Sequence, residues 1–135
     1  MTNKEYLRQL WTIDREIAAL MQEVDELRAR AESIGSLAVD GERVKSSPSQ
    51  DAKYTRYAEE IVDILDMVIS KQKEYGILRK RITQSIDRMV IPEERIVLRR
   101  RYFLHQTWER IAEEMNADRA TVIRWHGTAL LHFKK

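Results

Sequence analysis

The sequence predicts an all-α protein, in which a long antiparallel helical hairpin of coiled-coil type is followed by a C-terminal three-helix helix-turn-helix domain without a wing. Two patterns support this prediction. In residues 4–34 and 54–89, apolar side chains recur at alternating spacings of three and four, as in coiled-coil helices. Near the C-terminus, two short amphipathic stretches are joined by the tight connection Asn116-Ala117. Only four glycines and two prolines occur in 135 residues, which also favours long helices.

The first arm of the hairpin is predicted over residues 4–34. No glycine or proline interrupts it, and Gly35 is expected to end it as a C-terminal cap. Segment 35–52 is rich in glycine and serine and contains a proline, which predicts a loop. The seam positions of this arm are Tyr6, Leu10, Ile13, Ile17, Leu20, Val24, Leu27, Ala31 and Ile34.

The second arm follows the predicted loop, and Ser49 or Asp51 is expected to cap it. Two polar residues, Lys71 and Ser85, interrupt its seam. A polar seam residue can fix the register of a coiled coil, or a lysine can extend its ammonium group to water. The seam positions are Tyr54, Tyr57, Ile61, Ile64, Val68, Lys71, Tyr75, Leu78, Ile82, Ser85 and Met89.

Each arm also carries a second apolar stripe, which a two-helix seam would leave exposed. A second copy of the chain can cover it, which predicts a homodimer or higher homo-oligomer with a four-helix arrangement. The alternative is that the C-terminal domain folds back over the stripes. The stripe positions are Leu7, Trp11, Ala18 and Met21 in the first arm and Ala58, Val62, Leu65 and Ile69 in the second.

A domain boundary is predicted at residue 90, which gives a hairpin over residues 1–90 and a second domain over residues 91–135. Ile91-Pro92 should break the second arm, because proline disfavours a helical conformation in the residue before it. A new helix should then run to Tyr102 or Phe103, with Glu93 and Glu94 at the positive end of its dipole. The arginines at 99–101 form a basic cluster, which is either a solvated face or a phosphate contact.

Two capped helices form the predicted helix-turn-helix. Thr107 should cap the helix Trp108 to Met115, with Ile111, Ala112 and Met115 facing inward, and Asp118 should cap the helix 118–131. On a helical wheel, the inward side of the last helix holds Val122, Trp125, Ala129 and Phe133. The opposite side holds Ala120, Arg124, Gly127 and Thr128, flanked by Thr121 and Ile123.

This opposite side has the chemistry needed to read double-stranded DNA, because small residues allow a close approach to base edges. Arg124 can pair with a guanine through two hydrogen bonds, and Thr121 or Ala120 can contact a thymine methyl group. A net charge of +3 over residues 91–135 fits an anionic partner. The expected base contacts are Arg119, Ala120, Thr121, Ile123, Arg124 and Thr128, and the expected phosphate contacts are Thr107, Trp108 and Arg110.

Several other functions are disfavoured by composition. The chain has no cysteine, its three histidines lack metal-ligand spacing, and its adjacent acidic pairs diverge on a helix, so we expect no enzyme activity, no metal and no cofactor. No apolar run approaches the ~20 residues that span a membrane. The N-terminus does not follow the order of a signal peptide, which predicts a cytoplasmic location and no membrane partner.

The run ERIVLRRRYFLHQTWERIAEEMNADRATVIRWHGTALLHF resembles region 4 of the sigma-70 family. With the coiled coil before it, the chain is similar to sigma-like transcriptional regulators of phages and prophages in Gram-positive bacteria. The resemblance implies a DNA-binding transcriptional regulator, with contact to host RNA polymerase as a further expectation. Three residues depart from the pattern: Arg100 for leucine, His105 for a turn glycine and Asp118 for serine. No segment resembles sigma region 2.

Two alternatives remain open at the level of sequence. Small terminase subunits of phages also join a helix-turn-helix to a helical oligomerisation hairpin, and they recognise packaging DNA. A coiled-coil adaptor with a protein-binding C-terminal bundle is the third hypothesis. The number of subunits in the assembly distinguishes the transcriptional regulator from the terminase subunit. The effect of Arg124→Ala on partner binding distinguishes both DNA-binding hypotheses from the adaptor.

Overall fold

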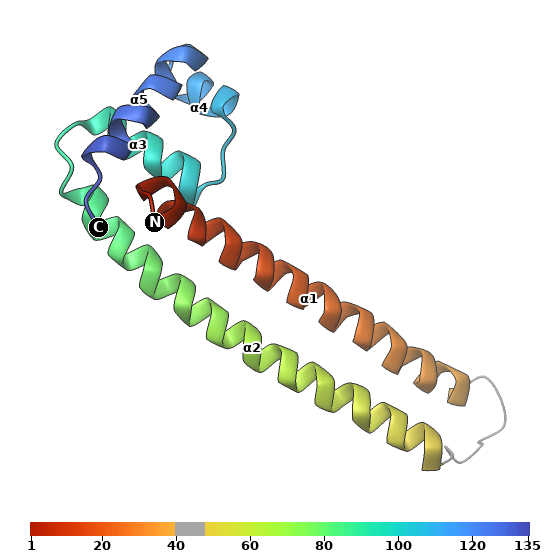
Figure 1. The fold of residues 1–135 in the computed structure, drawn as a ribbon. Coiled ribbons are helices and arrows are strands. Elements are labelled where there is room, and N and C mark those ends of the chain that lie inside the picture. Colours follow the sequence, from red (N-terminus) through yellow and green to blue (C-terminus); the bar gives the residue numbers. More distant parts are fainter. Residues whose placement is uncertain (40–47) are drawn as a thin grey trace. The chain divides into compact units, whose positions relative to one another are not determined.

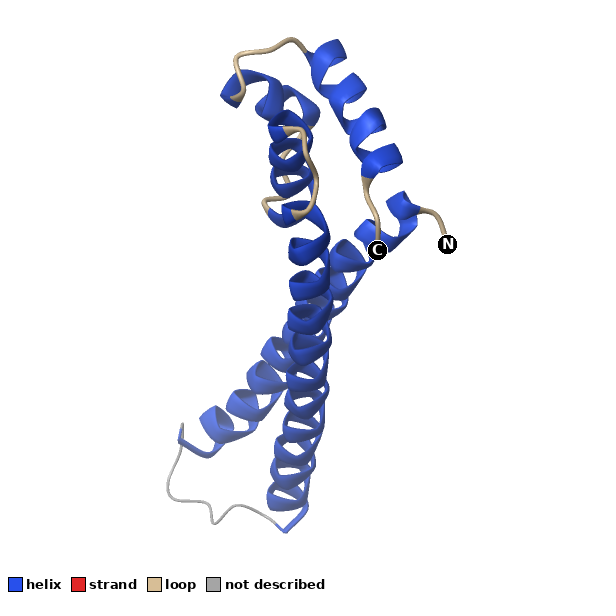
Figure 2. Ribbon diagram, turned by 90° about the vertical axis from the view of Figure 1, so that its left-hand side faces the viewer, coloured by secondary structure: helices blue, strands red, loops and turns tan. Residues whose placement is uncertain are grey.

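The computed structural model describes residues 1–39 and 48–135, and within these ranges the chain is helical without any strand (Figures 1 and 2). The predicted all-α class is therefore confirmed. The elements are the α-helices α1 (Asn3–Val39), α2 (Pro48–Asp87), α3 (Pro92–Leu98), α4 (Trp108–Glu114) and α5 (Arg119–His132), with the π-helical segment η1 (Arg99–Phe103) between α3 and α4.

The two long helices extend further into the predicted loop than expected. α1 continues through Gly35 to Val39, so the prediction that Gly35 ends this helix was wrong. A glycine inside a helix costs only about 1 kcal/mol, which does not suffice to stop it. α2 begins at Pro48, so Ser49 and Asp51 lie in its first turn and not at its cap. Proline is well suited to such a first turn. Of the predicted loop, residues 40–47 lie outside the described residues.

The chain forms two compact units, and both long helices pass from one unit into the other. One unit is Arg15–Lys73, and the other combines Met1–Asp14 with Glu74–Lys135. Within the first unit, Lys71 Nζ lies 2.5 Å from Glu16 Oε2, while Arg28 and Glu32 line one hollow together with Tyr54. These pairings show that the segments of α1 and α2 in this unit run in opposite directions. The ion pair also gives the seam lysine a partner.

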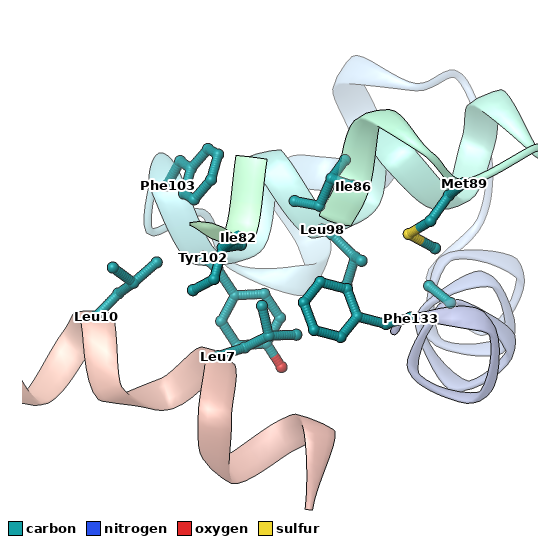
Figure 3. Packing of buried hydrophobic residues seen from close by; sticks show 10 residues of the cluster. Leu7, Leu10, Ile82, Ile86, Met89, Leu98, Tyr102, Phe103 and Phe133 are labelled. Carbon is teal, nitrogen blue, oxygen red and sulfur yellow. The ribbon is translucent and has the colours of Figure 1, made fainter. Parts of the chain in front are cut away.

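The core of the second unit joins the N-terminal turns of α1 to the last turns of α2 and to the C-terminal helices (Figure 3). Within this core, Trp11 stacks on Tyr102, with ring centroids 4.9 Å apart. The compact unit that contains α4 and α5 therefore includes residues on both sides of the predicted boundary at residue 90. The buried members are Leu7, Leu10, Ile82, Ile86, Met89, Leu98, Tyr102, Phe103, Ala129 and Phe133.

The second apolar stripes have different surroundings in the two units. Leu7 is fully buried and Trp11 is half-buried against the C-terminal helices, as expected if these helices fold back over α1. In the other unit, Val62 and Ile69 stay exposed on α2. No helix among the described residues has the length and apolarity to cross a lipid bilayer.

The helix after Pro92 changes its geometry before it ends. The backbone N–H of Leu104 donates to the carbonyl of Arg99 across 3.1 Å, a span of five residues, so the last turn is a π-helix. His105 then adopts φ 54°, in the left-handed region. This wider turn carries Tyr102 and Phe103 into the core, and both side chains are buried.

Candidate functional site on helices α4 and α5

Both short helices begin at the caps that the sequence predicted. The Thr107 hydroxyl accepts a hydrogen bond from the backbone N–H of Arg110 at 3.2 Å. Asp118 Oδ1 accepts from the N–H of Thr121 at 2.8 Å. Hydrogen bonds from the side chain and backbone of Thr121 lower the pKa of Asp118, so this carboxylate stays anionic beside the exposed face. Between the helices, Asn116 has φ 50°, a left-handed conformation that asparagine tolerates.

A small core fixes α4 against α5. The predicted inward residues Ile111, Ala112 and Val122 are buried, and Met115 and Trp125 are half-buried around them. Ala129 and Phe133, further along α5, belong to the larger core of the same unit. The predicted orientation of both helices is therefore confirmed.

The opposite face of α5 is open to solvent. A Cβ atom added at Gly127 would meet nothing within 4 Å, so packing does not require a glycine there. Within the described residues, the guanidinium of Arg124 makes no hydrogen bond and no ion pair shorter than 4 Å, although its charge helps to lower the pKa of Asp118. Thr128 donates from its hydroxyl to the carbonyl of Trp125 at 3.1 Å, which leaves the oxygen as an acceptor. Ala120, Ile123, Arg124, Gly127 and Thr128 are exposed and Thr121 is half-buried.

The other two arginines of this surface are paired with acidic side chains. Arg119 Nε donates to Glu109 Oε1 at 2.8 Å, and Arg110 Nε donates to Glu114 Oε1 at 2.8 Å. The backbone N–H of Glu109, together with Arg119, lowers the pKa of the Glu109 carboxyl. Residues 107–133 hold three arginines and four carboxylates. The basic surplus of the C-terminal region therefore lies outside α4 and α5.

The basic cluster at 99–101 is occupied by contacts within its own unit. Arg99 pairs with Asp87, and Arg100 pairs with Glu114. Arg101 donates to the carbonyl of Gln106 at 2.8 Å, and burial lowers its pKa. These partners were not visible in the sequence, because they come from α2, from α4 and from the turn after η1. The cluster holds η1 in place and is not a free basic face.

Trp108, for which the sequence predicts a phosphate contact, also takes part in packing within its unit. It is half-buried, and the Arg101 guanidinium carbon lies 4.2 Å from its ring centroid. The same guanidinium also faces Trp11, at 5.1 Å. Arg101 is thus held between the two indole rings by cation–π contacts, which connect the start of α4 to α1.

His126 is a buried polar residue, and its burial was not predicted from the sequence. Its Nε2 lies 2.8 Å from the hydroxyl of Tyr102, and its ring makes a T-shaped contact with Trp108, with centroids 4.7 Å apart. Burial, together with the charges of Lys4, Arg101 and Arg8, lowers the pKa of His126 to about 4. Burial also raises the pKa of Tyr102 to about 12. At neutral pH both groups are uncharged, so the tyrosine hydroxyl can donate to the imidazole nitrogen.

The positions of the inward residues along α5 already indicated that His126 is buried. His126 follows Val122 by four residues and precedes Ala129 by three, so it lies on the inward side of the helix. His105 was noted as a departure from a turn glycine, and its positive φ agrees with the strain expected there. Its Nε2 lies 3.0 Å from Asp14 Oδ2 on α1, an anchor that glycine would not provide.

Among the described residues, no group of three or more histidine, aspartate or glutamate side chains converges as a metal site would require. Comparison of the chain with protein families, with curated proteins and with solved structures finds no match.

Proposed function

We propose that this protein is a sequence-specific DNA-binding transcriptional regulator of phage or prophage origin. In this proposal α4 and α5 form a helix-turn-helix, and α5 lies in the major groove of double-stranded DNA. The observation that carries the proposal is Arg124, an exposed guanidinium on the open face of a capped helix that makes no hydrogen bond or close ion pair within the described part of the chain.

The neighbours of Arg124 support this role. Ala120 and Gly127, on either side of Arg124, have a very small side chain or none. The backbone of α5 can therefore approach base edges closely. A bidentate arginine–guanine pair discriminates against a wrong base by about 1–3 kcal/mol. Arg124 would therefore supply specificity. Arg119 would join it after release from Glu109.

The long helices serve assembly in this proposal. The segments of α1 and α2 in the Arg15–Lys73 unit form the antiparallel hairpin, and its exposed apolar residues Tyr54, Val62 and Ile69 pair with a second copy. A homodimer would present two reading helices to two half-sites. By resemblance to sigma region 4, host RNA polymerase is a further partner of the regulator in the bacterial cytoplasm.

The test is selection of bound duplexes from a random DNA library by the full chain, followed by anisotropy titrations at several salt concentrations. Arg124→Ala is expected to lower the affinity for the selected sequence by about 1–3 kcal/mol and to relax the preference at one base pair. Arg56→Ala is the matched control, because Arg56 is exposed on α2 far along the chain from α5. Equal effects of the two substitutions would contradict the role of Arg124.

A protein-binding adaptor is the second candidate, and the charge balance of α4 and α5 favours it. Four carboxylates against three arginines make a surface that is not basic, whereas phosphate contacts require an excess of positive charge. The same titrations separate the two functions. An adaptor would show no salt-dependent binding to any duplex, and this result would reject the DNA-binding proposal.

A further inference from the structure

A hollow of about 480 Å³ lies on the unit that contains the C-terminal helices, between the end of α2, the start of α3 and the end of α5. Its volume is within the range of small-molecule sites, which is roughly 300–1,000 Å³. It is separate from the exposed face of α5 around Arg124, because none of the expected base-contacting residues lines it.

The walls of this hollow include the most exposed large apolar side chains of the unit. Val90 is 88% exposed and Leu131 is 81% exposed, and Ile91 beside them is 40% exposed. Met89 forms a buried part of the wall. Apolar residues that cluster around a hollow mark a binding surface more than isolated exposed ones do. A ligand with an apolar body would remove these side chains from water.

The charges around the hollow favour an anion. Arg88 and Lys134 are both exposed at its edge, and Lys134 has no ion pair within the described residues. Arg88 donates to the hydroxyl of Ser85 at 3.3 Å, and no carboxylate pairs with it in the described part of the chain. Two cations without acidic partners beside an apolar wall fit a ligand that carries a negative head group.

The one carboxylate that lines the hollow is already engaged. Glu94 is only 1% exposed, and its two oxygens lie 2.6 and 2.8 Å from Nδ1 of His132. The imidazole N–H donates to this carboxylate and shields it from the opening. The negative charge of Glu94 offsets one of the two cations, so the lining keeps an excess of one positive charge. The pair with His132 fixes the end of α5 against α3.

A second hollow on α2, of about 350 Å³, provides a contrast on the same chain. It also has an apolar wall, formed by Tyr54 and Val62, but the charged residues that line it are Glu59 and Asp63. Its rim would attract a cation and repel an anion. The two hollows therefore offer similar apolar surfaces with opposite charge.

We propose that the hollow between α2, α3 and α5 binds a small amphiphilic anion, of the class of medium-chain or aromatic carboxylates. The apolar body would lie against Val90, Ile91 and Leu131, and the carboxylate would face Arg88 and Lys134. Binding does not depend on the function of α5, so it can be tested separately from DNA recognition.

The experiment is calorimetric titration of the full chain with decanoate below its micellar concentration, with decanol and decyltrimethylammonium as probes of equal apolar length. Decanoate is expected to bind most tightly and decyltrimethylammonium most weakly. Backbone amide shifts should change in residues 85–94 and 131–134. Equal binding of decanoate and decanol, or shift changes centred on α2 residues 54–63, would overturn the proposal.

Four variants make the test specific. Arg88→Gln and Lys134→Gln should each weaken decanoate binding about two- to fivefold, as loss of an exposed ion pair does, and leave decanol binding unchanged. Leu131→Ser should weaken binding of both. Val62→Ser removes apolar surface from the acidic hollow and should change neither. If the two glutamine variants bind decanoate as the unmodified chain does, the proposal fails.

Discussion

Nε of Arg119 donates to Oε1 of Glu109 across 2.8 Å, and this ion pair joins the first turn of α5 to the first turn of α4. Both side chains are more than half exposed, so solvent weakens the pair. An arginine for which the sequence predicts a base contact is thus held by a carboxylate in the free protein. Binding to DNA would require the exchange of this carboxylate for a phosphate or a base.

Glu109→Gln is expected to raise DNA affinity about two- to fivefold at low salt, because Arg119 loses its acidic partner. Anisotropy titrations on the selected duplex measure the change. Glu93→Gln is the control, since it also removes one exposed carboxylate from the C-terminal helices, and Glu93 has no ion pair within the described residues. If both variants gain affinity equally, only the net charge matters and the Arg119–Glu109 pair has no particular role.

Gly127→Ala should separate stability from binding. Alanine is favoured over glycine inside a helix by about 0.5–1 kcal/mol, and the added methyl group meets no other atom in the free protein. Chemical denaturation should therefore show a more stable variant, while the titration should show weaker DNA binding. Gly76→Ala is the matched control, because Gly76 is also helical with open space at its Cβ position. Unchanged DNA affinity in Gly127→Ala would mean that this face does not approach the groove.

The Asp118 carboxylate caps α5, but its negative charge opposes the binding of DNA. Asp118→Ala should lower the free energy of unfolding, because the N–H of Thr121 loses its acceptor. Asp118→Ser should keep most of this stability and bind DNA more tightly, because serine caps the helix without a negative charge. Urea denaturation and anisotropy measure the two effects. A serine variant that binds DNA no better than the unmodified chain would contradict the electrostatic part of this prediction.

Acid should destabilise the protein through His126. The folded state lowers the pKa of His126 from 6.5 to about 4, so its neutral form contributes stability that is fully present above pH 6.5. This contribution, up to about 3 kcal/mol, is lost as the pH falls from 6.5 towards 4. Urea denaturation between pH 7 and pH 4 measures it. The variant His126→Gln should show a flatter dependence in this window, and an equally steep one would contradict the assignment.

The proposed homodimer can be tested by substitution of the exposed apolar residues of α2. Light scattering is expected to show a homodimer, and Val62→Glu should produce monomers at micromolar concentration, because it places a charge in the interface. Met67→Glu is the control, since Met67 is similarly exposed but lies five residues further on, on a different side of the helix. A ring of about eight or more subunits would favour DNA packaging over regulation, and a monomeric unmodified chain would reject the dimer.

Local features of the C-terminal helices were predictable because they depend on neighbours along the chain. A cap requires a side-chain oxygen two or three residues before a free N–H, and Thr107 and Asp118 satisfy this condition in the sequence. The inward positions Val122 and Ala129 follow from helical periodicity alone. The exposure of Arg124 follows from the same periodicity.

The partners of the charged residues were not predictable, because they come from distant parts of the chain. His105 meets Asp14 across a separation of 91 residues, and His132 meets Glu94 across 38. Arg101 could be interpreted as a basic residue for phosphate, but the fold places it between two tryptophan rings. Periodicity gives no information about such pairings.

For this protein, the sequence by itself determined the all-helical class, the caps of α4 and α5 and the solvent-exposed face of α5, since each depends on hydrogen bonds and periodicity within a few residues. Only the tertiary structure decided that the start of α1 packs with the C-terminal helices, that Arg119 is paired and that His126 is buried. The physical reason is that burial and ion pairing depend on which distant side chains share the same space.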